Sequence, residues 1–179
     1  VWLHEYLEDF PGKQDELRYV LTSIAPESKD SEFTWKDYQA RINNELVAIL
    51  GNFVNRSVVL THKYYDGVIP QAGEFTELEI AVQKEIETSI QNLNKNINAY
   101  RFRDALADAM NVARIGNKYL ADTEPWKLIK TDEERVKTIL FTALQICEQL
   151  TTVFIPFLPN TVVKLSGILN VSDNKLTAG

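Results

Sequence analysis

Apolar residues recur every three or four positions along most of the chain, which is the spacing of one face of an α-helix. The strict alternation of polar and apolar residues that is typical of a strand is hardly seen along the chain. We therefore predict an all-α fold, a helical bundle over residues 34–169. Its long helices are expected at 34–66, 76–97, 100–120 and 131–150, with short ones at 6–10, 15–24, around Trp126, and at 162–169.

Residues suited to helix ends support these boundaries. Thr34 is followed three positions later by Asp37, and Thr76 by Glu79, both resembling the capping box of a helix start. The acidic stretch 131–134 suits the start of another helix, where negative charge is favoured by the helix dipole. Gly67 suits the left-handed conformation just beyond a helix end.

Residues 1–33 differ in kind from the rest. Pro11 and Gly12 separate two short helical patterns, and the polar stretch 26–31 then breaks the periodicity. We therefore divide the chain into an N-terminal segment, 1–33, and a helical bundle, 34–179. We expect the N-terminal segment to be an appendage and the least stable portion of the chain.

Length and composition limit the class of protein. A chain of 179 residues with 45% hydrophobic residues can bury one full core. Cys147 is the sole cysteine, which excludes an internal disulfide and a cysteine-rich zinc knuckle, and fits a reducing compartment. No apolar run is long enough to span a bilayer. We predict a cytoplasmic protein with no membrane partner.

The charge argues against a general binder of DNA or RNA duplexes, because phosphate contacts dominate that kind of affinity. The net charge is −6 at pH 7. Only the segments 46–73 and 100–130 are net positive when the chain is divided by region. That distribution fits a protein that reads a few exposed bases better than one that wraps duplex backbone.

Three side chains within those segments suggest such a site. Asn52 and Arg56 are four residues apart, so on a helix they share one face. An amide and a guanidinium can hydrogen-bond the edge of an unpaired base, and the indole of Trp126 can stack on its plane. The alternative is a solvated polar face with Trp126 in the core.

Several motifs favour the site. The stretches 15–21, 33–41, 43–47, 50–56 and 63–70 resemble class I methionyl-tRNA synthetases. The pattern at 117–120, leading into 124–127, resembles the same family. The resemblance covers nearly the whole chain, with the motifs in the family's order.

The resemblance implies a ligand for the site and a place for each segment. The residues matching Asn52 and Arg56 recognise the first anticodon base, a cytosine, and the tryptophan matching Trp126 stacks there. Residues 1–33 would belong to the stem-contact fold, and the partners would be the anticodon loop of tRNA(Met) and the enzyme's own catalytic domain. Five basic residues are candidate contacts to the tRNA backbone: Arg101, Arg103, Lys118, Lys127 and Lys130.

No catalytic residue is predicted. The family's His-Ile-Gly-His-type and Lys-Met-Ser-Lys-Ser-type motifs are absent, and the only histidines are His4 and His62. We therefore expect a C-terminal fragment that holds no cofactor and is inactive alone. The full-length enzyme would use ATP and Mg²⁺, with Zn²⁺ as a further candidate. Two alternatives stay open: a helical protein-interaction adaptor, and the anticodon-binding bundle of another class I synthetase.

Overall fold

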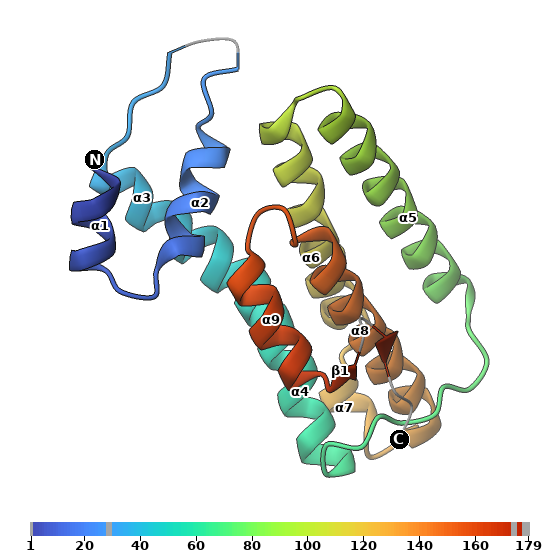
Figure 1. The fold of residues 1–179 in the computed structure, drawn as a ribbon. Coiled ribbons are helices and arrows are strands. Elements are labelled where there is room, and N and C mark those ends of the chain that lie inside the picture. The colour runs from blue at the N-terminus through green and yellow to red at the C-terminus, as the bar shows by residue number, and fades with distance from the viewer. Residues whose placement is uncertain (1, 28–29, 173–174, 177–179) are drawn as a thin grey trace.

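The computed structural model describes residues 2–27, 30–172 and 175–176, which form a bundle of helices (Figure 1). The helices are α1 (Leu3–Asp9), α2 (Gln14–Ser23), α3 (Trp35–Arg41), the π-helix η1 (Ile42–Gly51), α4 (Asn52–Tyr65), α5 (Glu77–Asn98), α6 (Phe102–Thr123), α7 (Pro125–Leu128), α8 (Glu133–Val153) and α9 (Pro159–Ile168). Two strands of two residues each, β1 (Val171–Ser172) and β2 (Lys175–Leu176), pair antiparallel. The predicted all-α class is confirmed, apart from this small hairpin.

The central element is α6. It packs against α5, α8, α4, η1 and α2, so its apolar residues face neighbours on several sides. Its buried side chains include Leu106, Met110, Ala113 and Leu120. The apolar residues whose spacing of three and four positions predicted this helix are therefore the ones that it buries in the core.

The segment predicted as one helix over 34–66 is helical throughout but not uniform. Figure 1 shows α3, η1 and α4 as one continuous rod. In its middle part the turns are wider, and the amide of Asn52 donates to the carbonyl of Val47, five residues earlier. Apolar spacing cannot distinguish such a π-helical stretch from an α-helix, because both leave a stripe on one side.

The residues predicted to mark helix ends at Thr34, Gly67 and Thr76 do so in the structure. The Thr34 hydroxyl accepts the amide of Asp37 at 3.1 Å, and Thr76 with Glu79 forms a capping box. Gly67 follows the end of α4 with a φ of +81°, and a Cβ there would lie 2.6 Å from the His62 ring. The last helix, α9, begins earlier than the predicted 162, because Pro159 suits the first turn of a helix.

The N-terminal segment is an appendage only in part. Helix α1 buries Tyr6 alone, but α2 contributes Tyr19 and Val20 to the main core. The Asp15 carboxylate accepts the amide of Thr161 at 2.6 Å, at the start of α9. The Arg18 guanidinium donates twice to one carbonyl of the α8–α9 connection. Helix α2 is thus held to the bundle by hydrogen bonds. The predicted division of the chain into residues 1–33 and 34–179 stays a prediction.

A buried carboxylate joins three of the long helices. Glu79, on α5, is fully buried and accepts hydrogen bonds from Arg135 on α8 at 2.6 and 2.9 Å and from Tyr119 on α6 at 2.6 Å. Thr76 donates to it through both its amide and its hydroxyl. Burial alone would raise the pKa of Glu79, but these donors outweigh it and lower the pKa to about 2.

We predict that Glu79→Gln lowers the free energy of unfolding by about 2–3 kcal/mol at neutral pH. The loss is smaller than for a fully enclosed ion pair because the Arg135 side chain keeps 21% of its surface in water. The depressed pKa gives stability that is present above the ordinary value of 4.5 and is lost as the pH falls toward 2. Urea titrations between about pH 6 and pH 2 should therefore show the variant losing less stability with acid than the native chain.

Glu134→Gln is the matched control for this prediction. Its carboxylate also pairs at 2.6 Å, with Lys137, but its side chain is 78% exposed. Surface pairs of this kind contribute less than about 1 kcal/mol. If the two variants lost equal stability, the buried carboxylate would not be what holds the three helices together.

Candidate nucleic-acid interface

The site begins with a close approach between α4 and α6. The ring of Phe53 is fully buried and lies against Gly116. A Cβ on Gly116 would sit 2.4 Å from the nearest ring atom, far inside contact distance. The missing side chain therefore lets the two helices pack closely at this point, and it fixes where the neighbouring residues, Asn52 and Asn117, meet.

Asn117 is on α6, and its side chain reaches across to the end of η1. Its side-chain Nδ2 donates to the carbonyl of Ile49 at 2.8 Å and to that of Ala113 at 3.1 Å. Its Oδ1 accepts a hydrogen bond from Nδ2 of Asn52 at 3.0 Å. Asn52 is itself exposed, so this contact anchors a surface side chain to the interior of the bundle.

Arg56 lies one turn further along α4, on the same face as Asn52. Its guanidinium carbon is 4.9 Å from the centroid of the Trp126 ring, a cation–π distance. Within the described ranges its guanidinium forms no ion pair, so its donors are not engaged by a carboxylate.

Local backbone geometry presents Trp126 to solvent. Glu124 takes a left-handed conformation with a φ of +42°, which ends α6 and turns the chain sharply. Pro125 then occupies the first turn of α7, and the amide of Lys127 donates to the carbonyl of Glu124 at 2.8 Å. Trp126 keeps 37% of its surface exposed, so the prediction that it is partly exposed is confirmed.

The structure thus places the three predicted residues around one surface formed by α4 and α7. It adds Asn117, which sequence reasoning did not select as a site residue. The available signal was an amide side chain directly after a glycine, on a helix face that also carries Ala113, Leu120 and Ala121. Such a residue at a helix contact needs a hydrogen-bond partner, and here the partners belong to η1 and α4.

The candidate backbone contacts divide into two groups. Lys118 follows Asn117 on α6, while Lys127 and Lys130 follow Trp126, so all three belong to the end of the bundle that carries the indole. Lys127 pairs with Glu124 at 2.7 Å, in an exposed and therefore weak ion pair. Arg101 and Arg103 stand at the start of α6, about 30 Å away along this 22-residue helix.

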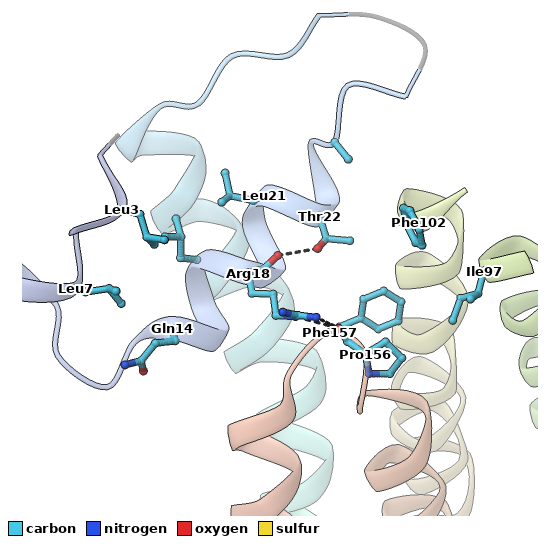
Figure 2. Close-up of a pocket in the computed structure, with 12 residues that line it drawn as sticks. Leu3, Leu7, Gln14, Arg18, Leu21, Thr22, Ile97, Phe102, Pro156 and Phe157 are labelled. Carbon is cyan, nitrogen blue, oxygen red and sulfur yellow. Dashed lines mark hydrogen bonds between the residues drawn. The ribbon is translucent and has the colours of Figure 1, made fainter. Parts of the chain in front are cut away.

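An apolar groove of about 770 Å³ lies at that other end of the bundle, between α1, α2 and the start of α6 (Figure 2). Leu3, Leu7, Leu21 and Phe102 are exposed along it. Its one charged lining residue, Arg18, is bound to a backbone carbonyl. The groove therefore offers mainly packing surface, and its uncharged polar lining side chains are those of Gln14 and Thr22.

The described residues offer little for covalent or metal chemistry. Cys147 is fully buried, and burial raises the pKa of its thiol to about 12, so it is not a nucleophile. Across 2–27, 30–172 and 175–176 no three His, Cys, Asp or Glu side chains gather as metal ligands would. None of the helices described is both long and apolar enough to cross a membrane. What the α4–α7 surface offers is hydrogen-bond donors, an acceptor and a ring.

Comparison with known proteins agrees with that chemistry. Residues 69–178 match the family model for the anticodon binding domain of methionyl tRNA ligase, and residues 1–58 match the model for class I tRNA synthetases (M). The methionine–tRNA ligase of Flavobacterium johnsoniae is 62% identical over 175 residues, which is 98% of this chain and 25% of that protein. The corresponding ligase of Bacteroides fragilis (strain YCH46) is 61% identical over 173 residues, 97% of this chain and 26% of that protein.

The fold is similar to that of a solved relative as well. Mycobacterium tuberculosis methionyl-tRNA synthetase in complex with methionyl-adenylate superposes with a TM-score of 0.85 at 25% sequence identity. The match covers 90% of this chain and 33% of that one. The chain spans about a quarter of the length of the curated relatives it matches.

We predict that Gly116→Ala lowers the free energy of unfolding by about 1–3 kcal/mol, although alanine is the better helix former. The added Cβ would force the Phe53 ring away and so separate α4 from α6. Gly167→Ala in α9 is the control, because nothing lies within 4 Å of a Cβ there, and it should leave stability unchanged or raise it by up to about 1 kcal/mol. Chemical denaturation measures both. Phe53→Leu should partly restore the Gly116→Ala variant, and a failure to do so would disconnect the cost from this contact.

Proposed function

The chain belongs to the family of anticodon-binding domains of methionyl-tRNA ligases, and from that premise we propose that it recognises the anticodon of a methionine tRNA. We assign the reading of the first anticodon base, a cytosine, to Asn52, Arg56 and Trp126. The observation that carries the proposal is the Arg56 guanidinium held over the Trp126 ring, on the same helix face as Asn52.

Each group would contribute differently. A guanidinium donates hydrogen bonds, which suits the N3 and O2 acceptors on the Watson–Crick edge of cytosine. The exposed indole of Trp126 supplies stacking surface, an interaction that tolerates any base. Discrimination therefore falls to Asn52 and Arg56, whereas Trp126 contributes affinity.

Three lysines would contact the phosphates of the bound RNA. Lys118, Lys127 and Lys130 are exposed at the end of the bundle that carries Trp126, where they would flank a bound anticodon loop. The Lys127–Glu124 pair is exposed and weak, so a phosphate could replace the carboxylate. We leave Arg101 and Arg103 out of this site because they lie at the opposite end of α6.

The family match favours this function over both alternatives weighed from the sequence. An adaptor needs a surface for a protein partner but no paired guanidinium and indole. The bundles of other class I synthetases read other anticodons, and the family model that matches 69–178 is the methionyl one. For the longer protein that carries such a domain, we propose ATP- and Mg²⁺-dependent attachment of methionine to its tRNA in the cytoplasm.

The 179-residue chain by itself should not form methionyl-adenylate. Adenylation needs charged groups positioned around the phosphates of ATP, and the sequence has neither of the family's ATP-handling motifs. Methionine-dependent exchange of pyrophosphate into ATP measures this directly. Exchange above background by the purified chain would show that it carries an adenylation site of its own.

Arg56→Ala should reduce the preference for cytosine at the first anticodon position by about tenfold or more, because hydrogen bonds from a charged donor are worth about 1.5–3 kcal/mol. Arg56→Lys should not restore the preference, since an ammonium lacks the planar fork of donors. Trp126→Ala should instead weaken all stem-loops about equally, by roughly 1–3 kcal/mol. The measurement is binding of a CAU anticodon stem-loop and its first-base variants at one fixed salt concentration.

Arg103→Ala is the matched control for that comparison. It removes an exposed arginine at the far end of α6 and should leave the preference for cytosine unchanged. A contact to phosphate behaves differently from a contact to a base edge, because its loss weakens all sequences alike and flattens the salt dependence. Equal weakening of every stem-loop by Arg56→Ala would therefore assign Arg56 to the backbone and place base recognition elsewhere.

A further inference from the structure

We infer that Asn117 is a positioning residue that fixes which end of the Asn52 carboxamide faces the ligand, and so makes the site select an amino group over a carbonyl on the base edge. The inference rests on the proposed anticodon function and deepens it. Asn117 need not touch the base. Its effect would pass through one hydrogen bond to Asn52.

The orientation of Asn117 follows from its partners. A carboxamide can be turned over without changing its shape, so its nitrogen and oxygen must be assigned from the groups they meet. One end of the Asn117 side chain faces two backbone carbonyls, those of Ile49 and Ala113. A carbonyl oxygen only accepts hydrogen bonds, so the NH₂ group must be at that end. The Oδ1 of Asn117 is therefore the atom that meets Asn52.

The orientation of Asn52 follows in turn. Because Oδ1 of Asn117 only accepts, the group 3.0 Å away on Asn52 must be its Nδ2. Turning Asn52 over would bring two carbonyl-type oxygens together and lose a hydrogen bond. The Oδ1 of Asn52 is thus the carboxamide atom that does not face Asn117, and no hydrogen bond to it is seen within the described part of the chain.

This arrangement fixes the order in which hydrogen-bond acceptors and donors follow one another on the surface. Asn52 presents an acceptor and, one turn along α4, Arg56 presents donors. Cytosine matches that order, because its amino group donates while its N3 and O2 accept. Uracil has a carbonyl in place of the amino group and an N3–H in place of the acceptor. Its carbonyl would face the Asn52 oxygen, and neither could donate.

The orientation of the Asn52 side chain is fixed by the packing of the bundle. Gly116 holds α6 close to α4 through its contact with Phe53, and Asn117 is the next residue along. Ile49, which supplies one of the two orienting carbonyls, lies in the π-helical stretch three residues before Asn52. The polarity of Asn52 is therefore set by groups that a ligand would not move.

The test compares stem-loop RNAs whose first anticodon base is cytosine or uracil, with binding to the 179-residue chain measured at fixed salt. Asn117→Ala should lower the cytosine-to-uracil preference by about tenfold, the value of one neutral hydrogen bond that is gained or lost. Most of the change should come from improved binding of uracil, because a released Asn52 can turn its NH₂ outward. In an Asn52→Ala background the same substitution should not change the preference, since the group it orients is gone.

Asn111→Ala is the matched control. Asn111 is also on α6 and also donates across to a neighbour, Ser89 on α5, at 3.0 Å. It should lower stability to a similar extent without changing the base preference. If Asn117→Ala left the preference intact, or weakened both RNAs equally, Asn117 would be purely structural and the inference would fall while anticodon binding stood. A native chain that did not prefer cytosine would overturn both.

Discussion

The buried carboxylate of Glu79 is the interaction on which the geometry of the bundle depends. It is fully buried, and it joins α5 to α8 through Arg135 and to α6 through Tyr119. An uncompensated charge in that position would be strongly destabilising, so the donors must all be in place together. Tyr119 is two residues beyond Asn117 on α6. The hydrogen bonds of Glu79 that join the long helices therefore also fix the register of the helix that carries Asn117.

A second constraint links the packing of the core to the side chains at the surface. The contact between Gly116 and Phe53 sets the spacing of α6 and α4, and Asn117 then reaches across to the end of η1 and to Asn52. Core packing thus positions the half-buried amide of Asn117, which in turn holds the exposed amide of Asn52. A recognition site built this way spends little of its binding energy on ordering its own side chains, because the packing has already fixed them.

The sequence predicted the helical class and the long helices well, because apolar spacing and caps such as Thr76 with Glu79 are local signals. It also selected Asn52, Arg56 and Trp126, the last two of which meet in space. It could not predict the wider turns of η1, which leave the apolar stripe unchanged, nor the fastening of α2 through Asp15, which depends on a residue more than a hundred positions away. Asn117 was missed for the same reason, since its role lies in contacts between helices.

An acidic chain that bound RNA, as we propose for this one, would obtain its selectivity from few contacts. With a net charge of −6, long-range attraction to phosphate is weak, and Lys118, Lys127 and Lys130 lie at the end of the bundle that carries Trp126. Weak backbone binding has an advantage for a reader of bases, because a large sequence-independent term would favour every tRNA equally. Specificity is a difference between affinities. In this chain that difference would be set by one fixed acceptor and one guanidinium, on a ring that accepts any base.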